Sequence, residues 1–142
     1  MSRMICLMYH ALYSSDKEFM RIPADERPYA VHTDTFARQL ACLRSQALPV
    51  APADVGSPAM SHGTMCNVLI TFDDGHISNY THAFPLLRQH DMRAIFFVTT
   101  DFVEGREDYC RWQHLREMSA AGMSIQSHGV THCFFDDMED QQ

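Results

Sequence analysis

The sequence of 142 residues contains no apolar run close to the roughly 18 residues that a membrane-spanning helix requires. Its first residues, MSRMICLMYHAL, have neither the long apolar core nor the small-residue cleavage site of a signal peptide. Basic residues are scarce as well, since 11 Lys and Arg stand against 18 Asp and Glu, for a formal net charge of −7. We therefore expect no membrane span, a cytoplasmic location by default, and no nucleic-acid partner, because phosphate binding needs basic patches.

Closely spaced cysteine pairs are also lacking, because the sequence has no CxxC motif. The total of five cysteines is odd. The five are Cys6, Cys42, Cys66, Cys110 and Cys133. A disulfide framework is not expected in a chain of this size without an export signal. We expect free thiols, most of them buried.

What the sequence does contain is an alternation of strand-like and helix-like segments. Apolar runs at residues 4–8, 67–72, 93–100 and 123–129 predict covered strands, and a shorter strand is expected from residue 48. Periodic segments at 32–46, within 77–90 and at 111–122 predict helices, whereas the polar segments 14–29 and 54–63 predict loops. In the last helix, Trp112, Leu115 and Met118 are expected to face inward. This alternation is typical of a single α/β domain with a parallel sheet or barrel.

Chemistry-bearing residues follow three of the predicted strands. Asp73 and Asp74 come after the strand at 67–72, His128 and His132 come after the strand that begins at 123, and His10 comes after the first strand. In parallel α/β folds the functional groups lie on the loops at the carboxyl ends of the strands. We therefore expect these side chains to lie at one edge of the sheet. Each motif alone is also typical of an ordinary solvated turn.

Two histidines and one carboxylate form a ligand set for zinc and similar divalent metals, with one position left open for water. Gly75 permits the sharp turn that would bring both acids to one site. A metal lowers the pKa of bound water, and the second carboxylate could then act as general base. A cation would also relieve the repulsion between the neighbouring Asp73 and Asp74.

The stretches LITFDDG and SHGVTH resemble the first two motifs of the polysaccharide deacetylase family, the nodulation-type chitooligosaccharide deacetylase domain. The segments FPLLRQHDMRAIFFV and WQHLREMSAAGMSIQSHG are similar to the helices and strands around those motifs. The opening LMYHAL resembles a subgroup that acts on poly-N-acetylglucosamine. The resemblance extends over residues 4–135 and is specific, since several motifs agree in their order.

The resemblance implies an α/β fold, here a partial, truncated form of the distorted (β/α) barrel, in a single domain of residues 1–142 that lacks its C-terminal portion. It implies a metal-dependent hydrolase that removes acetyl groups from N-acetylated, or alternatively O-acetylated, sugars or polysaccharide. By this resemblance Asp73 is the catalytic base, and Asp74, His128 and His132 hold one divalent metal ion. Zinc is the first expectation for that ion, with nickel, cobalt or iron as alternatives. His10 would lie at the same face, as a substrate-binding residue.

The sequence departs from the family pattern after the second motif. The family's later Tyr-containing loop, the Arg and Asp that orient the base, and the late His that acts as general acid have no counterpart here. Catalysis without an acid for the leaving amine should be weak, and an open barrel should expose a strand edge for self-association. Two alternatives therefore stand beside an active enzyme. One is a non-catalytic metal-binding fragment or subunit that a partner chain completes, and the other is a fold remnant without metal.

Overall fold

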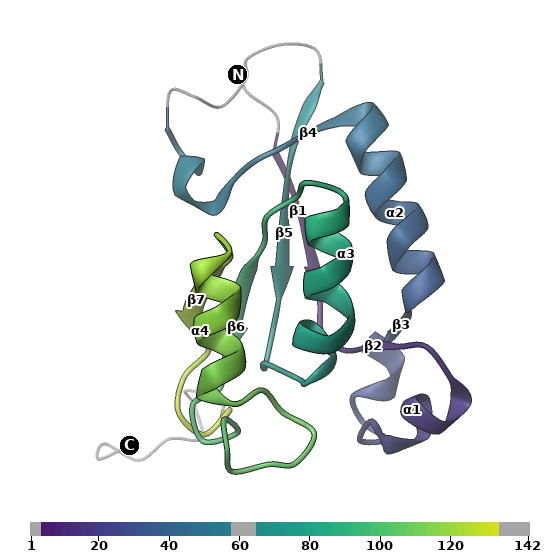
Figure 1. The fold of residues 1–142 in the computed structure, drawn as a ribbon, viewed down its shortest axis with the longest axis vertical. Coiled ribbons are helices and arrows are strands. Elements are labelled where there is room, and N and C mark those ends of the chain that lie inside the picture. The colour runs from purple at the N-terminus through teal and green to yellow at the C-terminus, as the bar shows by residue number, and fades with distance from the viewer. Residues whose placement is uncertain (1–3, 58–64, 134–142) are drawn as a thin grey trace.

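The computed structural model describes residues 4–57 and 65–133, and its centre is a parallel sheet (Figure 1). The strand order is β1-β5-β6-β7, and β4 pairs with the first residues of β5. All of these pairings are parallel. The strands are β1 (Met4–Tyr9), β4 (Ala47–Pro49), β5 (Cys66–Phe72), β6 (Ile95–Val98) and β7 (Ser124–Ser127). The predicted alternation and the parallel sheet are confirmed. The prediction that the strand from residue 123 is covered was wrong, because β7 is at the end of the described strand order and none of its residues is buried.

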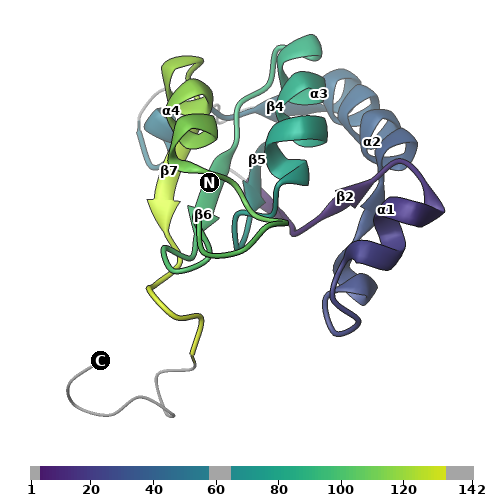
Figure 2. The same ribbon diagram turned by 60° about the horizontal axis from the view of Figure 1, so that its bottom comes forward.

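Three helices lie in one layer against the sheet, as Figure 2 shows. They are α2 (Thr33–Gln46), α3 (Phe84–Gln89) and α4 (Trp112–Ala120). A five-residue π-helical turn, η3 (Asn79–Ala83), leads into α3. The short helix α1 (Asp16–Arg21) is set apart from this layer, beside the two-stranded pair β2 (Leu12–Tyr13) and β3 (Val31–His32). None of the helices in the described ranges is long and apolar enough to cross a membrane.

Strand β5 forms the core of the sheet because its sequence is apolar on both faces. Six of its seven residues are buried. Its Phe72 ring stacks on Tyr9 of β1 at 5.4 Å and on Phe96 of β6 at 4.9 Å between ring centroids. Apolar residues on both faces are typical of a parallel strand with neighbours on either side. The position of β5 places the acidic turn that follows it at the middle of the sheet's carboxyl edge.

Strand β1 is an edge strand, and the prediction that it is buried was wrong. Its side chains at Met4, Ile5 and Met8 are 45%, 48% and 61% exposed. Within residues 4–57 and 65–133, β1 pairs only with β5. An apolar composition alone does not say whether both neighbours of a strand are present, so periodicity could not distinguish the two cases.

Residues 14–29 were predicted as a loop, but they contain α1. Ser15 caps this helix, because its hydroxyl accepts a hydrogen bond from the backbone N–H of Glu18. The Glu18 carboxylate in turn accepts hydrogen bonds from the backbone N–H and the hydroxyl of Ser14. A Ser followed three residues later by Glu is the sequence pattern of a helix N-terminus. That pattern was present in the sequence and was missed.

The predicted helices α2 and α4 are confirmed with small corrections. Leu115 and Met118 of α4 are buried as expected, but Trp112 is 42% exposed because it is the first residue of the helix. All five cysteines are free, as expected. Only Cys110 among them is buried, so the expectation of mostly buried thiols was wrong. Burial raises the pKa of the Cys110 thiol to about 12.

Candidate metal centre

The chain reverses sharply at the end of β5, and this reversal places both acids at the sheet edge. Asp74 and Gly75 adopt the left-handed backbone conformation, with φ of 70° and 85°. The Asp73 N–H donates to the carbonyl of Tyr9, and the Gly75 N–H donates to the carbonyl of Asp73, both at 2.9 Å. A Cβ on Gly75 would lie 3.0 Å from a methyl group of Val98. Only glycine meets both requirements, the positive φ and the close approach to β6.

The two histidines lie on an irregular loop after β7, not on a helix. The loop is held to the neighbouring strand by a hydrogen bond from the His128 N–H to the carbonyl of Val98, at 2.8 Å. The Thr100 N–H donates to the carbonyl of Gly129, at 3.1 Å, which joins this loop to the one after β6. Gly129 and His132 have φ of 89° and 63°. These contacts turn both imidazoles toward the end of β5.

Asp74, His128 and His132 converge on one point. Each offers one ligand atom, and these atoms lie within 4.8 Å of one another. The Oδ1 atom of Asp74 is 3.0 Å from Nε2 of His132 and 3.4 Å from Nε2 of His128. Ligand atoms about 2.0–2.1 Å from a tetrahedral zinc ion are separated from one another by about 3.3 Å. The two distances from Asp74 to the imidazole nitrogens are therefore close to the separation expected for ligands of one ion.

Asp74 shows why a cation fits this cluster. The residue is only 6% exposed, and its Oδ1 is a buried atom without a hydrogen-bond partner in the described structure. The imidazole nitrogens of His128 and His132 lie within ion-pair distance of this oxygen but form no hydrogen bond with it. A buried carboxylate without a partner is costly unless a positive charge lies beside it. Two imidazoles and one carboxylate are a donor set that suits zinc and related divalent metals.

Asp73 is at the same edge but is not one of these three residues. Its carboxyl group is partly buried, and burial raises its pKa above the usual value for Asp. The charges of His128 and His10 act in the opposite direction, and the neighbouring Asp74 again raises the pKa. A carboxyl group with a raised pKa is suited to accepting a proton.

His10 lies at the other side of the Asp74 carboxylate. Its Nε2 is 3.9 Å from Oδ2, the oxygen that does not face the histidine pair. The backbone carbonyl of His10 accepts a hydrogen bond from the Asn79 side chain, at 2.7 Å, which fixes the chain after β1. Its ring lies 5.2 Å from that of Tyr29, which is 60% exposed. All five residues singled out in the sequence therefore meet at one edge of the sheet.

Comparison with known proteins identifies the family. Residues 63–142, more than half of the chain, match the family model for polysaccharide deacetylases. This chain belongs to the polysaccharide deacetylase family. The Escherichia coli poly-β-1,6-N-acetyl-D-glucosamine N-deacetylase is 29% identical over 117 residues, which cover 68% of this chain and 17% of that protein. The Bacillus subtilis protein YxkH is 36% identical over 75 residues, which cover 53% of this chain and 26% of YxkH.

Solved structures of this family share the fold of the chain. The Streptococcus pyogenes deacetylase PplD, determined in complex with acetate, superposes with a TM-score of 0.76 and 29% identity. IcaB from Ammonifex degensii superposes with a TM-score of 0.72 and 30% identity. These two matches cover 96% and 90% of this chain but only 61% and 53% of the relatives. The predicted fold, part of a barrel of the polysaccharide deacetylase type, is confirmed.

Two residues near the centre of this deacetylase-family chain were missed in the sequence. Glu26 accepts a hydrogen bond from the hydroxyl of Tyr109, at 2.8 Å. Burial raises the pKa of Glu26, and the nearby charge of Asp74 also raises it. Burial likewise raises the pKa of Tyr109. No motif marks either residue, since they are 83 positions apart and only the folded chain brings them together.

Proposed function

We propose that this chain carries the metal-binding part of a hydrolase that removes acetyl groups from N-acetylated sugar polymers. The observation that carries the proposal is the buried Oδ1 of Asp74, which has no hydrogen-bond partner in the described structure and faces two imidazole nitrogens. Membership in the polysaccharide deacetylase family supports the reaction class. Asp74, His128 and His132 would hold one divalent ion, with zinc as the first expectation and nickel, cobalt or iron as alternatives.

A bound ion of this kind would polarise the acetyl carbonyl and lower the pKa of water at the site. The protein side chains then manage the protons. The carboxylate of Asp73 takes the proton of the attacking water, and its partial burial favours the protonated form that results. Asp73 stays outside the ligand set in this proposal, because its neighbour Asp74 supplies the carboxylate that faces the histidines.

His10 is proposed to contact the substrate. Its Nε2 faces the carboxylate oxygen that is turned away from His128 and His132. The His10 ring would therefore lie beside a sugar whose acetyl group reaches the centre. A proton on Nε2 of His10 would be available to the leaving amine.

The substrate is proposed to be a polymer that contains N-acetylglucosamine. The support comes from the Escherichia coli relative, whose name specifies poly-β-1,6-N-acetyl-D-glucosamine. That relative is 29% identical to this chain, and the match covers 17% of its length. The reacting group would be the N-acetyl group of one glucosamine unit of that polymer.

A second candidate is a metal-binding subunit whose site another chain completes. The observation in its favour is the apolar outer edge of β1, where Met4, Ile5 and Met8 are exposed. A strand edge of this kind pairs readily with a second polypeptide. In this proposal residues 1–142 form part of one deacetylase domain, and the chain self-associates through β1. Sedimentation of the protein and of Met8→Lys tests this, since a charge on the edge should reduce association.

The deciding experiment measures acetate released from an N-acetylglucosamine oligomer by the zinc-loaded chain. Asp73→Asn keeps the shape of the base and the three ligands, so we expect zinc binding to remain and the rate to fall at least about 100-fold. Asp101→Asn is a matched control, because it makes the same change at an exposed position outside the ligand set. If Asp73→Asn released acetate as fast as the native chain, Asp73 could not be the catalytic base. Zinc binding without any release by the native chain would favour the second candidate.

A further inference from the structure

A cavity of about 350 Å³ lies beside the metal centre, between α1 and the chain that leaves the acidic turn. One wall is the segment 76–82, and another is the loop at residues 107–108. A hydrogen bond from the Ile77 N–H to the carbonyl of Asp108, at 2.8 Å, holds these two walls together. None of the three proposed metal ligands lines the cavity. Its volume is within the range of small-molecule sites.

The inner surface of the cavity contains a buried histidine with a free donor. His76 is only 7% exposed, and its Nδ1 is 3.2 Å from the Ser78 N–H and 2.7 Å from the Ser78 hydroxyl. The Ser78 N–H can only donate, so Nδ1 is an acceptor, and the Ser78 hydroxyl, which itself accepts from the Leu12 N–H at 2.8 Å, can donate to Nδ1 as well. Because Nδ1 accepts from Ser78, the proton of the neutral ring is on Nε2. No described residue accepts a hydrogen bond from this Nε2.

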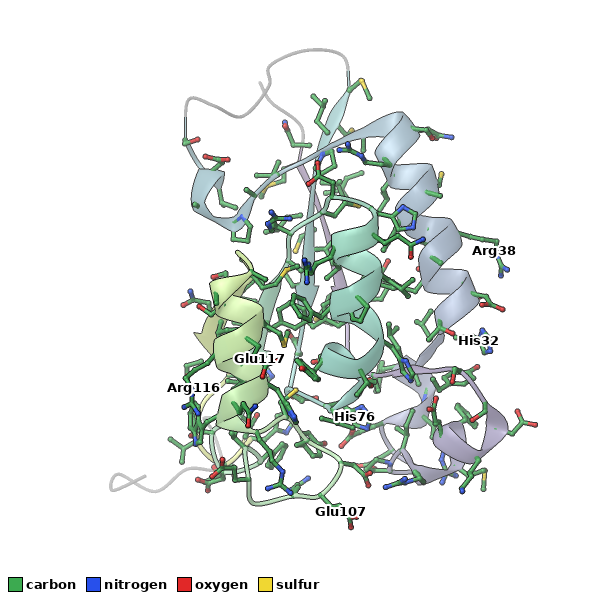
Figure 3. The ribbon with its side chains drawn as sticks, viewed as in Figure 1. His32, Arg38, His76, Glu107, Arg116 and Glu117 are labelled. Carbon is green, nitrogen blue, oxygen red and sulfur yellow. The ribbon has the colours of Figure 1, made fainter. Side chains whose placement is uncertain are left out.

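The rim of the cavity is charged, and its charges do not balance. Two ion pairs connect α1 with the opposite walls: Glu18 with His82 at 3.1 Å, and Arg21 with Asp108 at 2.9 Å. The exposed Glu107 also lines the cavity, and it has no ion pair among the described residues. Figure 3 shows His76 near the lower end of α3 and Glu107 projecting from the loop below it. The rim therefore keeps a net negative charge next to the Nε2 donor of His76.

These features together match the chemistry of an amino sugar. The apolar side chains of Leu12 and Ile77 line the cavity and offer a surface for the C–H face of a sugar ring. The Nε2–H of His76 can donate to a sugar hydroxyl or ring oxygen, and the unpaired Glu107 favours a cationic group. We propose that this cavity binds one sugar unit that carries a free, protonated amine. The inference rests on the proposed function in one respect, since removal of an acetyl group produces such an amine.

In this arrangement the chain would hold a deacetylated unit of the polymer next to the unit under reaction. Segment 74–76 connects the two places, because Asp74 belongs to the metal centre and His76 belongs to the cavity. A substrate that already contains a free amine would therefore be preferred over a fully acetylated one.

Calorimetric titration of the full chain with a glucosamine trimer tests the proposal without any need for catalysis. His76→Asn keeps an oxygen that can accept from Ser78 and removes the donor into the cavity, and Glu107→Gln removes the unpaired charge. We expect each change to weaken binding of the trimer about fivefold, the effect of one hydrogen bond or exposed charge. His90→Asn and Asp54→Asn make the same chemical changes outside the cavity and should leave the affinity unchanged.

The outcomes separate this proposal from the proposed function. Binding that is reduced in both cavity variants and retained in Asp74→Asn supports the cavity, whatever the acetate assay shows. Binding that is lost only in Asp74→Asn would place the amino sugar at the metal centre and overturn the proposal. Equal binding of an N-acetylglucosamine trimer would overturn the requirement for a free amine. The absence of binding by the native chain, or full affinity in Glu107→Gln, would overturn it as well.

Discussion

Substitution of Asp74 by Asn should change the stability of this protein in opposite directions with and without metal. The Asp74 side chain is 9% exposed, and its Oδ1 has no hydrogen-bond partner in the described structure. A buried acceptor left unsatisfied costs about 1–3 kcal/mol, and a negative charge adds to that cost. Asn keeps the shape, removes the charge and can donate from its amide to a neutral imidazole nitrogen. When a chelator keeps the protein free of metal, we therefore expect Asp74→Asn to have a free energy of unfolding about 1–2 kcal/mol higher than that of the native chain.

Zinc should reverse this order. A ligand present at 100 times its dissociation constant stabilises the native state by about 2.7 kcal/mol. The native chain should gain that amount, whereas Asp74→Asn lacks one of the three ligands and should gain close to nothing. The measurement is urea unfolding followed by circular dichroism at pH 8, where unperturbed histidines are neutral. It is made once with a chelator and once with zinc.

Asp73→Asn is the matched control, because it makes the same chemical change at the neighbouring residue and leaves Asp74, His128 and His132 intact. It should keep the full gain in stability with zinc. The reasoning would be refuted if Asp74→Asn destabilised the chelated protein by more than about 1 kcal/mol, a typical loss for a disrupted buried network. It would also be refuted if the variant kept the zinc effect.

Three further predictions concern the fold around the centre. Gly75→Ala should lower the free energy of unfolding by about 2–4 kcal/mol, and Gly129→Ala should lower it by only about 1–2 kcal/mol. Both glycines have a positive φ, but only Gly75 lies against β6. Equal losses of the two variants in urea unfolding would contradict this prediction. Cys110, with its pKa raised to about 12, should resist alkylation at pH 8 while the exposed Cys42 reacts, as mass spectrometry would show. A backbone N–H lowers the pKa of Glu18, so its stabilisation is present above the unfolded value and is lost as pH falls through the folded value. The melting temperature of Glu18→Gln should therefore fall less on acidification than that of the native chain. Equal falls in melting temperature for the two proteins would contradict this prediction.

Local patterns in the sequence account for most of the fold. The run NVLITF predicts a covered strand, and β5 is covered because its residues are apolar on both faces. Gly122 predicts the end of α4, and its φ of 90° is a conformation that glycine adopts readily. The exposure of β1 was not predictable, since it depends on which strands lie beside it. The ends and types of these elements follow from neighbouring residues in the chain, whereas the exposure of a strand depends on distant residues that pack beside it.

The candidate site also has a part that the sequence predicted and a part that only the fold decided. Asp73, Asp74, His10, His128 and His132 were identified because each follows an apolar run, and the carboxyl ends of parallel strands meet at one edge. Which carboxylate faces the histidines was beyond strand periodicity, because two consecutive left-handed residues set the direction of Asp74.

The sequence alone determined the kinds of chemistry that this protein can perform, because it specifies the donor atoms and the strand ends that carry them. The tertiary structure decided which of those atoms lie within reach of one ion, since Asp74 and His132 are 58 positions apart and meet at 3.0 Å. It also decided the cavity at His76, where two ion pairs connect α1 to residues far along the chain. Distances between such residues follow from the packing of the whole sheet, and no local pattern encodes them.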